Sequence, residues 1–119
     1  MPGITKNDLG TISIAEEVAA TIAGITTVES YGVVGMAAQR AGESFFELLG
    51  RENVRKGVVV SFVDNACVAD LHIIVEYGVS ISAVAQNVID NVTYCLRDTL
   101  GLDVSAVNVH VEGVRIQRS

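Results

Sequence analysis

Two histidines and their acidic neighbours are the residues of this 119-residue chain whose types and spacing best suit chemistry. His72 alternates with Asp70 and Glu76 along one apolar segment, and His110 alternates with Glu112 along another. In an extended strand, residues two apart point to the same side, so each histidine shares a face with carboxylates. If the two strands were neighbours, imidazoles and carboxylates would gather as a set of metal ligands.

An ordinary water-facing strand surface explains the same pattern. Asp, His and Glu are residues that such a surface commonly carries, and metal ligands usually follow tighter, more asymmetric spacing. The sequence therefore favours a solvated face, and we assign no metal, cofactor or catalytic residue. His72 and His110 remain the metal-ligand candidates, and a small-ligand or metal-binding module that uses this face is the alternative function.

The nucleophile and nucleotide-binding patterns point the same way. Cys67 and Cys95 stand far apart without a CxxC companion, which is neither a zinc pattern nor a disulfide framework, so we expect reduced thiols. Both fall on apolar sides of their segments and are expected in the core. The sequence contains no GxSxG, GxGxxG or GxxxxGK motif, so it indicates neither a serine hydrolase nor a phosphate cradle. We expect a protein that is not an enzyme.

A GxxG pattern, Gly32 to Gly35, raises the hypothesis of a KH-like RNA-binding domain. Such loops clamp a phosphate backbone, so their central residues are usually polar or basic, whereas two valines stand here. The chain carries 14 acidic and 8 basic residues, a net charge of −6, and lacks the basic cluster that nucleic acid requires. We expect glycines around a buried bend and no nucleic-acid partner.

The segment "ESFFELLG" concentrates large apolar groups and predicts a short amphipathic helix ended by Gly50. Two interpretations stay open: a lid over the edge of the core, or a docking ridge, since aromatic clusters anchor protein interfaces. The partner-contact candidates are Phe45, Phe46, Leu48 and Leu49.

Composition predicts one domain spanning residues 1–119, with residues 1–9 loosely ordered. Half of the residues are hydrophobic while only 5% are aromatic, which indicates an aliphatic core and either very complete burial or apolar surface that meets a partner. The start of the chain lacks the basic and apolar regions of a signal peptide. No apolar run approaches the ~20 residues of a membrane span, so we expect no direct membrane insertion.

Hydrophobic periodicity predicts the elements. Strands are expected at 10–14, 56–63, 67–78 and 106–116, and residues 31–38 could form a strand or a tight turn. Helices are expected at 14–30 and 81–100. The first has Ile14, Val18, Ile22 and Ile25 on its apolar face. The second carries an apolar stripe of Ile81, Val84, Ala85, Val88, Ile89, Val92, Cys95 and Leu96. On the strand at 67–78 the core side is Cys67, Ala69, Leu71, Ile73 and Val75.

This order predicts an α+β fold. Two main amphipathic helices would cover one face of a mixed sheet of three to four strands, as a two-layer sandwich. A glycine at 78 permits the turn from a core strand into a core helix, so we interpret this junction as architecture.

Four segments, "YGVVGMA" (31–37), "KGVVV" (56–60), "IIVEYGVSISAVAQNV" (73–88) and "VNVHVEGVRI" (107–116), carry a family resemblance. In this order and spacing, the chain from about residue 10 to 116 resembles the alkaline-shock, or envelope stress response, family of mostly Gram-positive bacteria. The residues that match its signature, which we interpret as structural, are Tyr31, Gly32, Gly35, Tyr77, Gly78 and Gly113.

The resemblance implies a small cytoplasmic protein of cell-envelope homeostasis and of alkaline or general stress. Family members include proteins that self-associate and proteins held at the membrane by a membrane-anchored relative, and the family has no established catalytic residues to carry over. The resemblance therefore implies a non-enzymatic interaction or scaffold protein that forms homo-oligomers and contacts protein partners, at most peripheral to the inner face of the membrane.

Overall fold

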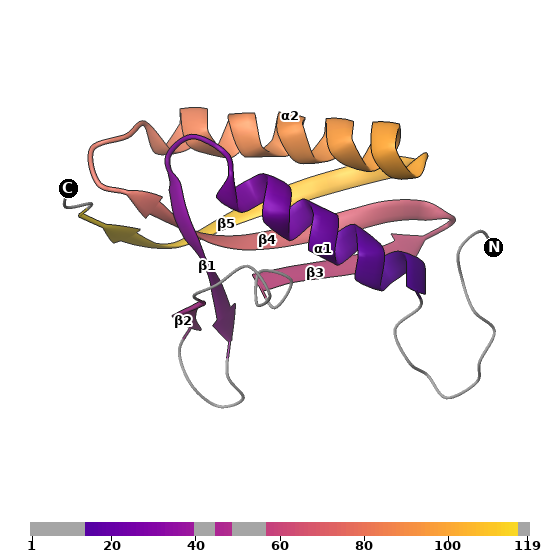
Figure 1. The fold of residues 1–119 in the computed structure, drawn as a ribbon, viewed down its shortest axis with the longest axis horizontal. Coiled ribbons are helices and arrows are strands. Elements are labelled where there is room, and N and C mark those ends of the chain that lie inside the picture. The colour runs from indigo at the N-terminus through magenta and orange to yellow at the C-terminus, as the bar shows by residue number, and fades with distance from the viewer. Residues whose placement is uncertain (1–13, 40–44, 49–56, 117–119) are drawn as a thin grey trace.

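The computed structural model describes residues 14–39, 45–48 and 57–116, and every structural statement below concerns those residues. The strand predicted at 10–14, the start at 1–9 and Leu49 lie outside them. The elements in chain order are α1 (Ile14–Val28), β1 (Val33–Gln39), β2 (Phe45–Leu48), β3 (Val58–Val63), β4 (Ala66–Glu76), α2 (Ile81–Leu100) and β5 (Val104–Arg115) (Figure 1).

Strand β4 organises the five-stranded sheet. One of its edges pairs antiparallel with β3 at residues 66–71 and with β1 at residues 73–75, so these two strands share that edge end to end. The other edge pairs with β5 in parallel, and β2 pairs with β1 further out. The sheet is therefore mixed, as the sequence predicted.

The core lies between the sheet and the helices. Alternate side chains of β4 are fully buried because both edges of the strand are paired and one face is covered. Burial of one such aliphatic side chain stabilises the fold by about 1.5–3 kcal/mol. The buried β4 side chains, each 0% exposed, are Cys67, Ala69, Leu71, Ile73 and Val75, as predicted.

Helix α2 packs one narrow stripe on the core. Its buried residues are Val84, Val88, Val92 and Leu96, four of the predicted eight. Ser80 begins the helix by accepting a hydrogen bond from Ala83 N at 3.3 Å, and Gly101 ends it with φ 67°. Ile81, predicted in the stripe, is 46% exposed, because it lies in the first turn, before the first buried residue of the stripe.

Helix α1 buries a different line of residues from the one predicted. The fully buried residues are Ala19, Ala23 and Thr27, whereas Val18 is 40% exposed. Ile22 and Ile25 pack against the core while remaining partly exposed. The helix contacts α2, β1, β3 and β4, and small side chains let it approach that many neighbours closely. The predicted face of α1 was chosen from its bulky apolar residues, whereas the residues that are fully buried in the structure have small side chains.

The structure decides two further predictions, the strand or turn at 31–38 and the short helix at "SFFELLG". Val33–Gln39 is the strand β1, which settles the strand-or-turn alternative. The short helix predicted at "SFFELLG" is wrong, because Phe45–Leu48 forms the strand β2. It pairs antiparallel with the end of β1, from Met36 opposite Leu48 to Gln39 opposite Phe45, and this non-local pairing overrides the local helical pattern.

The fold class is confirmed as α+β, with two helices packed on an open sheet. The fifth strand, β2, is one more than the three to four expected, because it replaces the predicted short helix. Neither described helix is long and apolar enough to cross a membrane.

Two glycines with positive φ give a matched test of the packing. Gly32 (φ 85°) and Gly78 (φ 96°) both adopt a conformation that costs an L-residue about 1–2 kcal/mol. A Cβ added at Gly78 meets nothing within 4 Å, whereas one added at Gly32 would collide with Val84 Cγ2. We expect Gly32→Ala to lower the free energy of unfolding by ~1–3 kcal/mol more than Gly78→Ala, measured by urea denaturation. Equal losses would show that Val84 does not pack against this turn.

Candidate functional site

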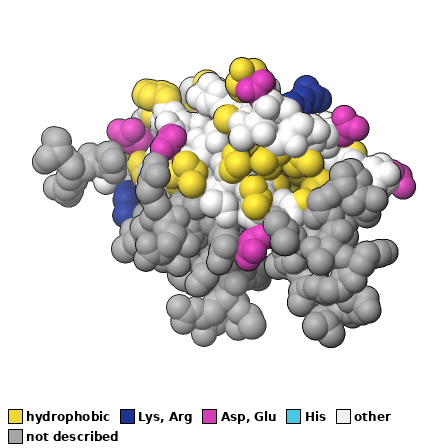
Figure 2. Space-filling view, turned by 45° about the vertical axis from the view of Figure 1, so that its right-hand side comes forward, with side chains coloured by type: hydrophobic (Ala, Val, Ile, Leu, Met, Phe, Trp, Pro, Cys, Tyr) yellow, Lys and Arg dark blue, Asp and Glu magenta, His cyan; other side chains and the backbone are white. Residues whose placement is uncertain are grey.

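The β4–β5 pairing builds a polar cluster on the face of the sheet opposite the core. In the parallel register, His72 lies beside His110 and Asp70 lies beside Asn108. The sequence placed these residues on outward strand faces, and the structure brings the two strands side by side. Figure 2, which views a different face of the molecule, shows no histidine.

Each histidine in this cluster contacts a carboxylate. His72 Nδ1 lies 2.9 Å from Glu112 Oε2, and His110 Nε2 lies 3.1 Å from Asp70 Oδ1. Asn108 Nδ2 also donates to Asp70 Oδ1, at 3.1 Å. The two imidazole rings stack with centroids 4.6 Å apart and an interplanar angle of 15°. Glu112 reaches His72 from the extra residue of a β-bulge, because the register shifts between Val111 and Gly113.

The electrostatics of the cluster favour an ionised Asp70. The hydrogen bond with His110 lowers the pKa of Asp70 below its usual value, against a smaller opposing effect of burial, and Asn108 adds to the lowering. The Asp70 side chain is 33% exposed, so water screens most of this interaction. The cluster is a partly hydrated pair of histidine–carboxylate contacts.

The cluster does not have the geometry of a metal site. In stacked rings the nitrogen lone pairs point sideways, and here one nitrogen of each ring faces its own carboxylate. In the described part of the chain, no group of three or more His, Cys, Asp or Glu side chains is arranged to hold a metal ion. His72 and His110 are thus brought together without a converging third ligand.

The cysteines lie in two different environments. Cys67 is fully buried, and desolvation, reinforced by the charge of Glu16, raises the pKa of its thiol. A buried thiol with a raised pKa is a poor nucleophile, which fits the predicted core role. Cys95 is only partly buried, because the buried stripe of α2 passes through Val92 and Leu96 instead.

Two Tyr-Gly turns meet at one end of the sheet. Glu76 N donates to Gly32 O at 2.8 Å, and Tyr77 N donates to Arg115 O at 2.8 Å, which ties the ends of β1, β4 and β5 together. The two glycines lie on the backbone turns, while the tyrosine side chains point to water: Tyr31 is 74% exposed and Tyr77 is 69% exposed.

Other apolar side chains lie exposed at this end. Ile81 begins α2 directly after the Tyr77 turn, and Val114 lies beside Val75 at the end of β4. We define the end patch as the exposed side chains of Tyr31, Tyr77, Ile81, Val114 and Ile116. From the sequence, both tyrosines were interpreted as structural and Ile81 was predicted in the apolar stripe of its helix, while Val114 and Ile116 were given no role. The sequence signal for the end patch was an apolar residue at the end of each of these elements. Strand and helix periodicity does not detect this signal, because it scores the residues within an element.

The remaining signature glycines lie at strand irregularities. Gly35 follows a register shift between β1 and β4, and Gly113 follows the bulge in β5. A Cβ added at Gly113 would lie 3.2 Å from Ile74 Cδ1, so the glycine leaves room for that side chain. The partner-contact candidates Phe45, Phe46 and Leu48 are residues of the strand β2, and Leu49 lies outside the described residues.

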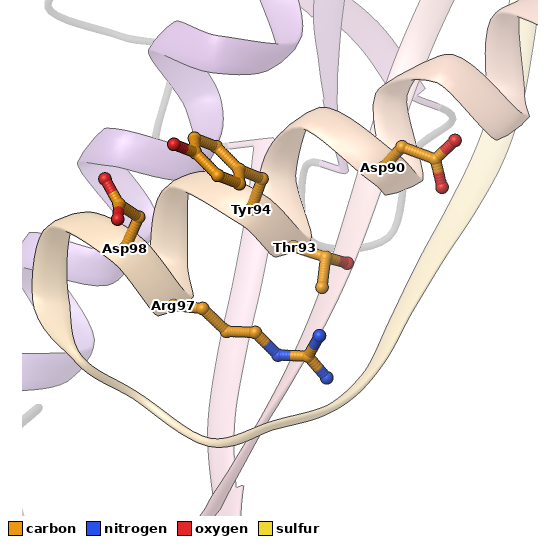
Figure 3. A pocket seen from close by; sticks show the side chains of 5 residues that line it. All are labelled: Asp90, Thr93, Tyr94, Arg97 and Asp98. Atoms are coloured by element: carbon orange, nitrogen blue, oxygen red, sulfur yellow. The ribbon is translucent and has the colours of Figure 1, made fainter.

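A shallow hollow of about 490 Å³ lies on the outer side of α2 (Figure 3). Arg97 extends from α2 toward the segment that leads into β5, and its Nη2 donates to Val104 O at 3.4 Å. The hollow is open to solvent, whereas sites for small molecules enclose most of their ligand. Its lining residues are Asp90, Thr93, Tyr94, Arg97 and Asp98.

Hydrophobic side chains also gather on the helical side. Figure 2 shows them in the middle of the view, below the paler surface at the top, at the height that α1 occupies in Figure 1. Val18 of α1, 40% exposed, is a large hydrophobic residue on this side.

These features define a small α+β domain whose distinctive residues lie on open surfaces. Residues 4–116 match the alkaline shock protein 23 family, which is described as having a cell envelope-related function. The chain therefore belongs to this family, and the resemblance seen in the sequence is confirmed.

Similar proteins occur in Gram-positive bacteria. The chain is 43% identical over 112 residues to the uncharacterized protein YloU of Bacillus subtilis, covering 93% of each chain. It is 39% identical over 108 residues to the uncharacterized protein Spy1614 of Streptococcus pyogenes, covering 90% of this chain and 89% of that one. It is 36% identical over 107 residues to the uncharacterized protein YqhY of B. subtilis, covering 90% and 78%.

The lowered pKa of Asp70 predicts a pH-dependent contribution to stability. A carboxyl group with a depressed pKa stabilises the fold above its ordinary pKa, and the contribution is lost as the pH falls through the lowered value. Asp70→Asn should lower the free energy of unfolding at pH 7, by less than about 1 kcal/mol because the group is partly exposed. Urea denaturation at pH 7 and at pH 2–3 should show this difference shrinking toward zero in acid. Asp98→Asn, on the exposed side of α2, is the control, and a loss that grows in acid would contradict the assignment.

Proposed function

We propose that this protein serves cell-envelope homeostasis and the response to alkaline or general stress as a non-enzymatic interaction protein. It binds protein partners, among them a membrane-anchored relative, and associates with itself. It works in the cytoplasm and reaches the inner face of the membrane through such a partner. Membership of a family with a cell envelope-related function supports the setting of this proposal.

The end patch is the observation that carries the proposal. Tyr31 and Tyr77 come from two different turns and expose most of their side chains at the same end of the sheet. Exposed tyrosines and aliphatic side chains at one end of a domain are the kinds of residue found at the apolar centre of protein interfaces, and tyrosine is enriched among residues that dominate binding energy. The backbone hydrogen bonds between Glu76 and Gly32 and between Tyr77 and Arg115 hold the patch on a rigid support, so little ordering entropy opposes binding.

The alternative function, a metal-binding or small-ligand module on the outer sheet face, has less support. Its two histidines each contact a carboxylate, and their stacked rings do not converge on a common point. The hollow beside α2 is shallow and open, and it lies on a different element. Contacts through surfaces account for more of the described features than ligand capture does.

Replacing the two tyrosines tests the proposal. In cells of the source organism, chemical crosslinking of the tagged Tyr31→Ser/Tyr77→Ser variant should recover the wild-type neighbours at least roughly 10-fold less efficiently, because each lost aromatic anchor costs ~1–2 kcal/mol of binding energy. Quantitative mass spectrometry of the crosslinked products is the measurement.

Tyr94→Ser is the matched control, because Tyr94 is 65% exposed but lies on α2, away from the Tyr-Gly turns. It should retain the neighbours. Equal recovery by both variants would remove the end patch from the proposal, and a wild-type protein that crosslinks to nothing would overturn the function itself.

A further inference from the structure

The outer edge of β5 has no strand partner among the described residues. β5 pairs with β4 alone, and its 12 residues make it the longest strand described. Cys67 N donates a hydrogen bond to the carbonyl oxygen of Asp103 at 2.7 Å. Because successive carbonyls of a strand point to opposite edges, the next carbonyl, that of Val104, faces the outer edge. Arg97 Nη2 donates to this carbonyl at 3.4 Å, so the first carbonyl of the edge already has a side-chain partner, which a pairing strand would replace.

Between its two bulges, β5 lacks the residues that usually block such an edge. Long edge strands are normally interrupted by proline or lysine, because their unpaired backbone groups form a template for another strand. β5 reads VSAVNVHVEGVR, with neither residue, and its charged side chains, Glu112 and Arg115, stand near its end. The stretch from Ala106 to Val111 pairs with β4 without interruption, between one bulge at Ser105 and another at Glu112.

We propose that a second copy of this chain pairs antiparallel with the outer edge of β5, across a two-fold axis that passes through Val109. The two sheets then form one continuous sheet, with the helices of both copies on the same side. This inference rests on the self-association in the proposed function and identifies the surface that performs it.

The two bulges of β5 select this register. Opposite residues of an antiparallel pair must lie on the same face of the sheet, and each bulge shifts the alternation of faces by one residue. Centring on Val109 sets Val107 opposite Val111 of the second copy, and Val104 opposite Val114 of the second copy. All four residues lie beside core-facing residues of β4, so their faces match. Centring one or two residues away sets a core-facing residue opposite an outward one beyond a bulge.

The charges in this register are complementary. Arg115 of each copy lies opposite Asp103 of the other, and both residues are exposed. On the outward face, Asn108 lies opposite His110 of the second copy, so no two like charges oppose each other at the centre of the pairing. Isologous pairing uses each of these contacts twice.

A cysteine at the two-fold axis tests the register directly. In antiparallel neighbours, opposite Cα atoms are about 4.5–5.5 Å apart, a separation that a disulfide bridges. In a Cys95→Ala background, which leaves only the buried Cys67, Val109→Cys should form a covalent dimer under mild oxidation. Val114→Cys is the control: Val114 is 52% exposed, more than the half-buried Val109, yet it lies opposite Val104 and should stay monomeric.

A charge reversal tests the same contact without oxidation. Asp103→Arg or Arg115→Asp alone should weaken dimerisation on the order of 10-fold in sedimentation velocity, since two exposed ion pairs become repulsive. The double variant exchanges both charges and should restore the wild-type dissociation constant. A thermal melt of each variant separates loss of pairing from loss of folding.

The outcomes separate this inference from the proposed function. A wild-type dimer with no Val109→Cys crosslink and no rescue by the double variant would overturn the β5 edge while self-association stands. A crosslink at Val114→Cys as efficient as at Val109→Cys would overturn the register. A strict monomer at high concentration would overturn both the edge and self-association, while partner capture by the end patch remains a separate result.

Discussion

The burial of β4 is the constraint on which the described structure depends. Both edges of this strand are occupied and its core-facing side chains are completely inaccessible to water. Every other described element contacts β4 or packs on an element that does. In the described part of the chain the interior is filled mainly by aliphatic side chains, and the groups that we propose for recognition lie where strands end or leave an edge unpaired.

The polar residues of the sheet follow from the same arrangement. Asp70 and His72 alternate with buried residues on β4, so they must point to the outer face, where β5 supplies His110 and Glu112 as partners. In the described part of the chain no buried side-chain nitrogen or oxygen lacks a hydrogen-bond partner. The outer face is thus internally satisfied, while the Tyr-Gly turns expose their tyrosine side chains and the outer edge of β5 has no strand partner among the described residues.

Sequence periodicity predicted what burial alone dictates. The alternation of buried and outward residues in β4, and the stripe of four buried residues on α2, were recognisable because each element buries one face on the same core. The α1 face was predicted from bulky residues and missed Ala19 and Ala23, since close helix packing selects small side chains that a hydrophobicity pattern underweights. The strand β2 was missed because its pairing with β1 is non-local. The alternation of residues predicted that His72 and His110 point outward from their strands. The parallel register that places them side by side was not predictable, because the sequence of a strand does not specify which strand pairs with it.

Amide hydrogen exchange of the wild-type protein, compared at dilute and high concentration, tests this account most directly. If β4 is the foundation and recognition occurs at its margins, the amides of β4 should exchange only through global unfolding at every concentration. Amides on the outer edge of β5 should gain protection as the concentration rises, while those of β3 should not. Exchange of β4 as fast as that of its neighbours, or protection of β5 that ignores concentration, would contradict the account.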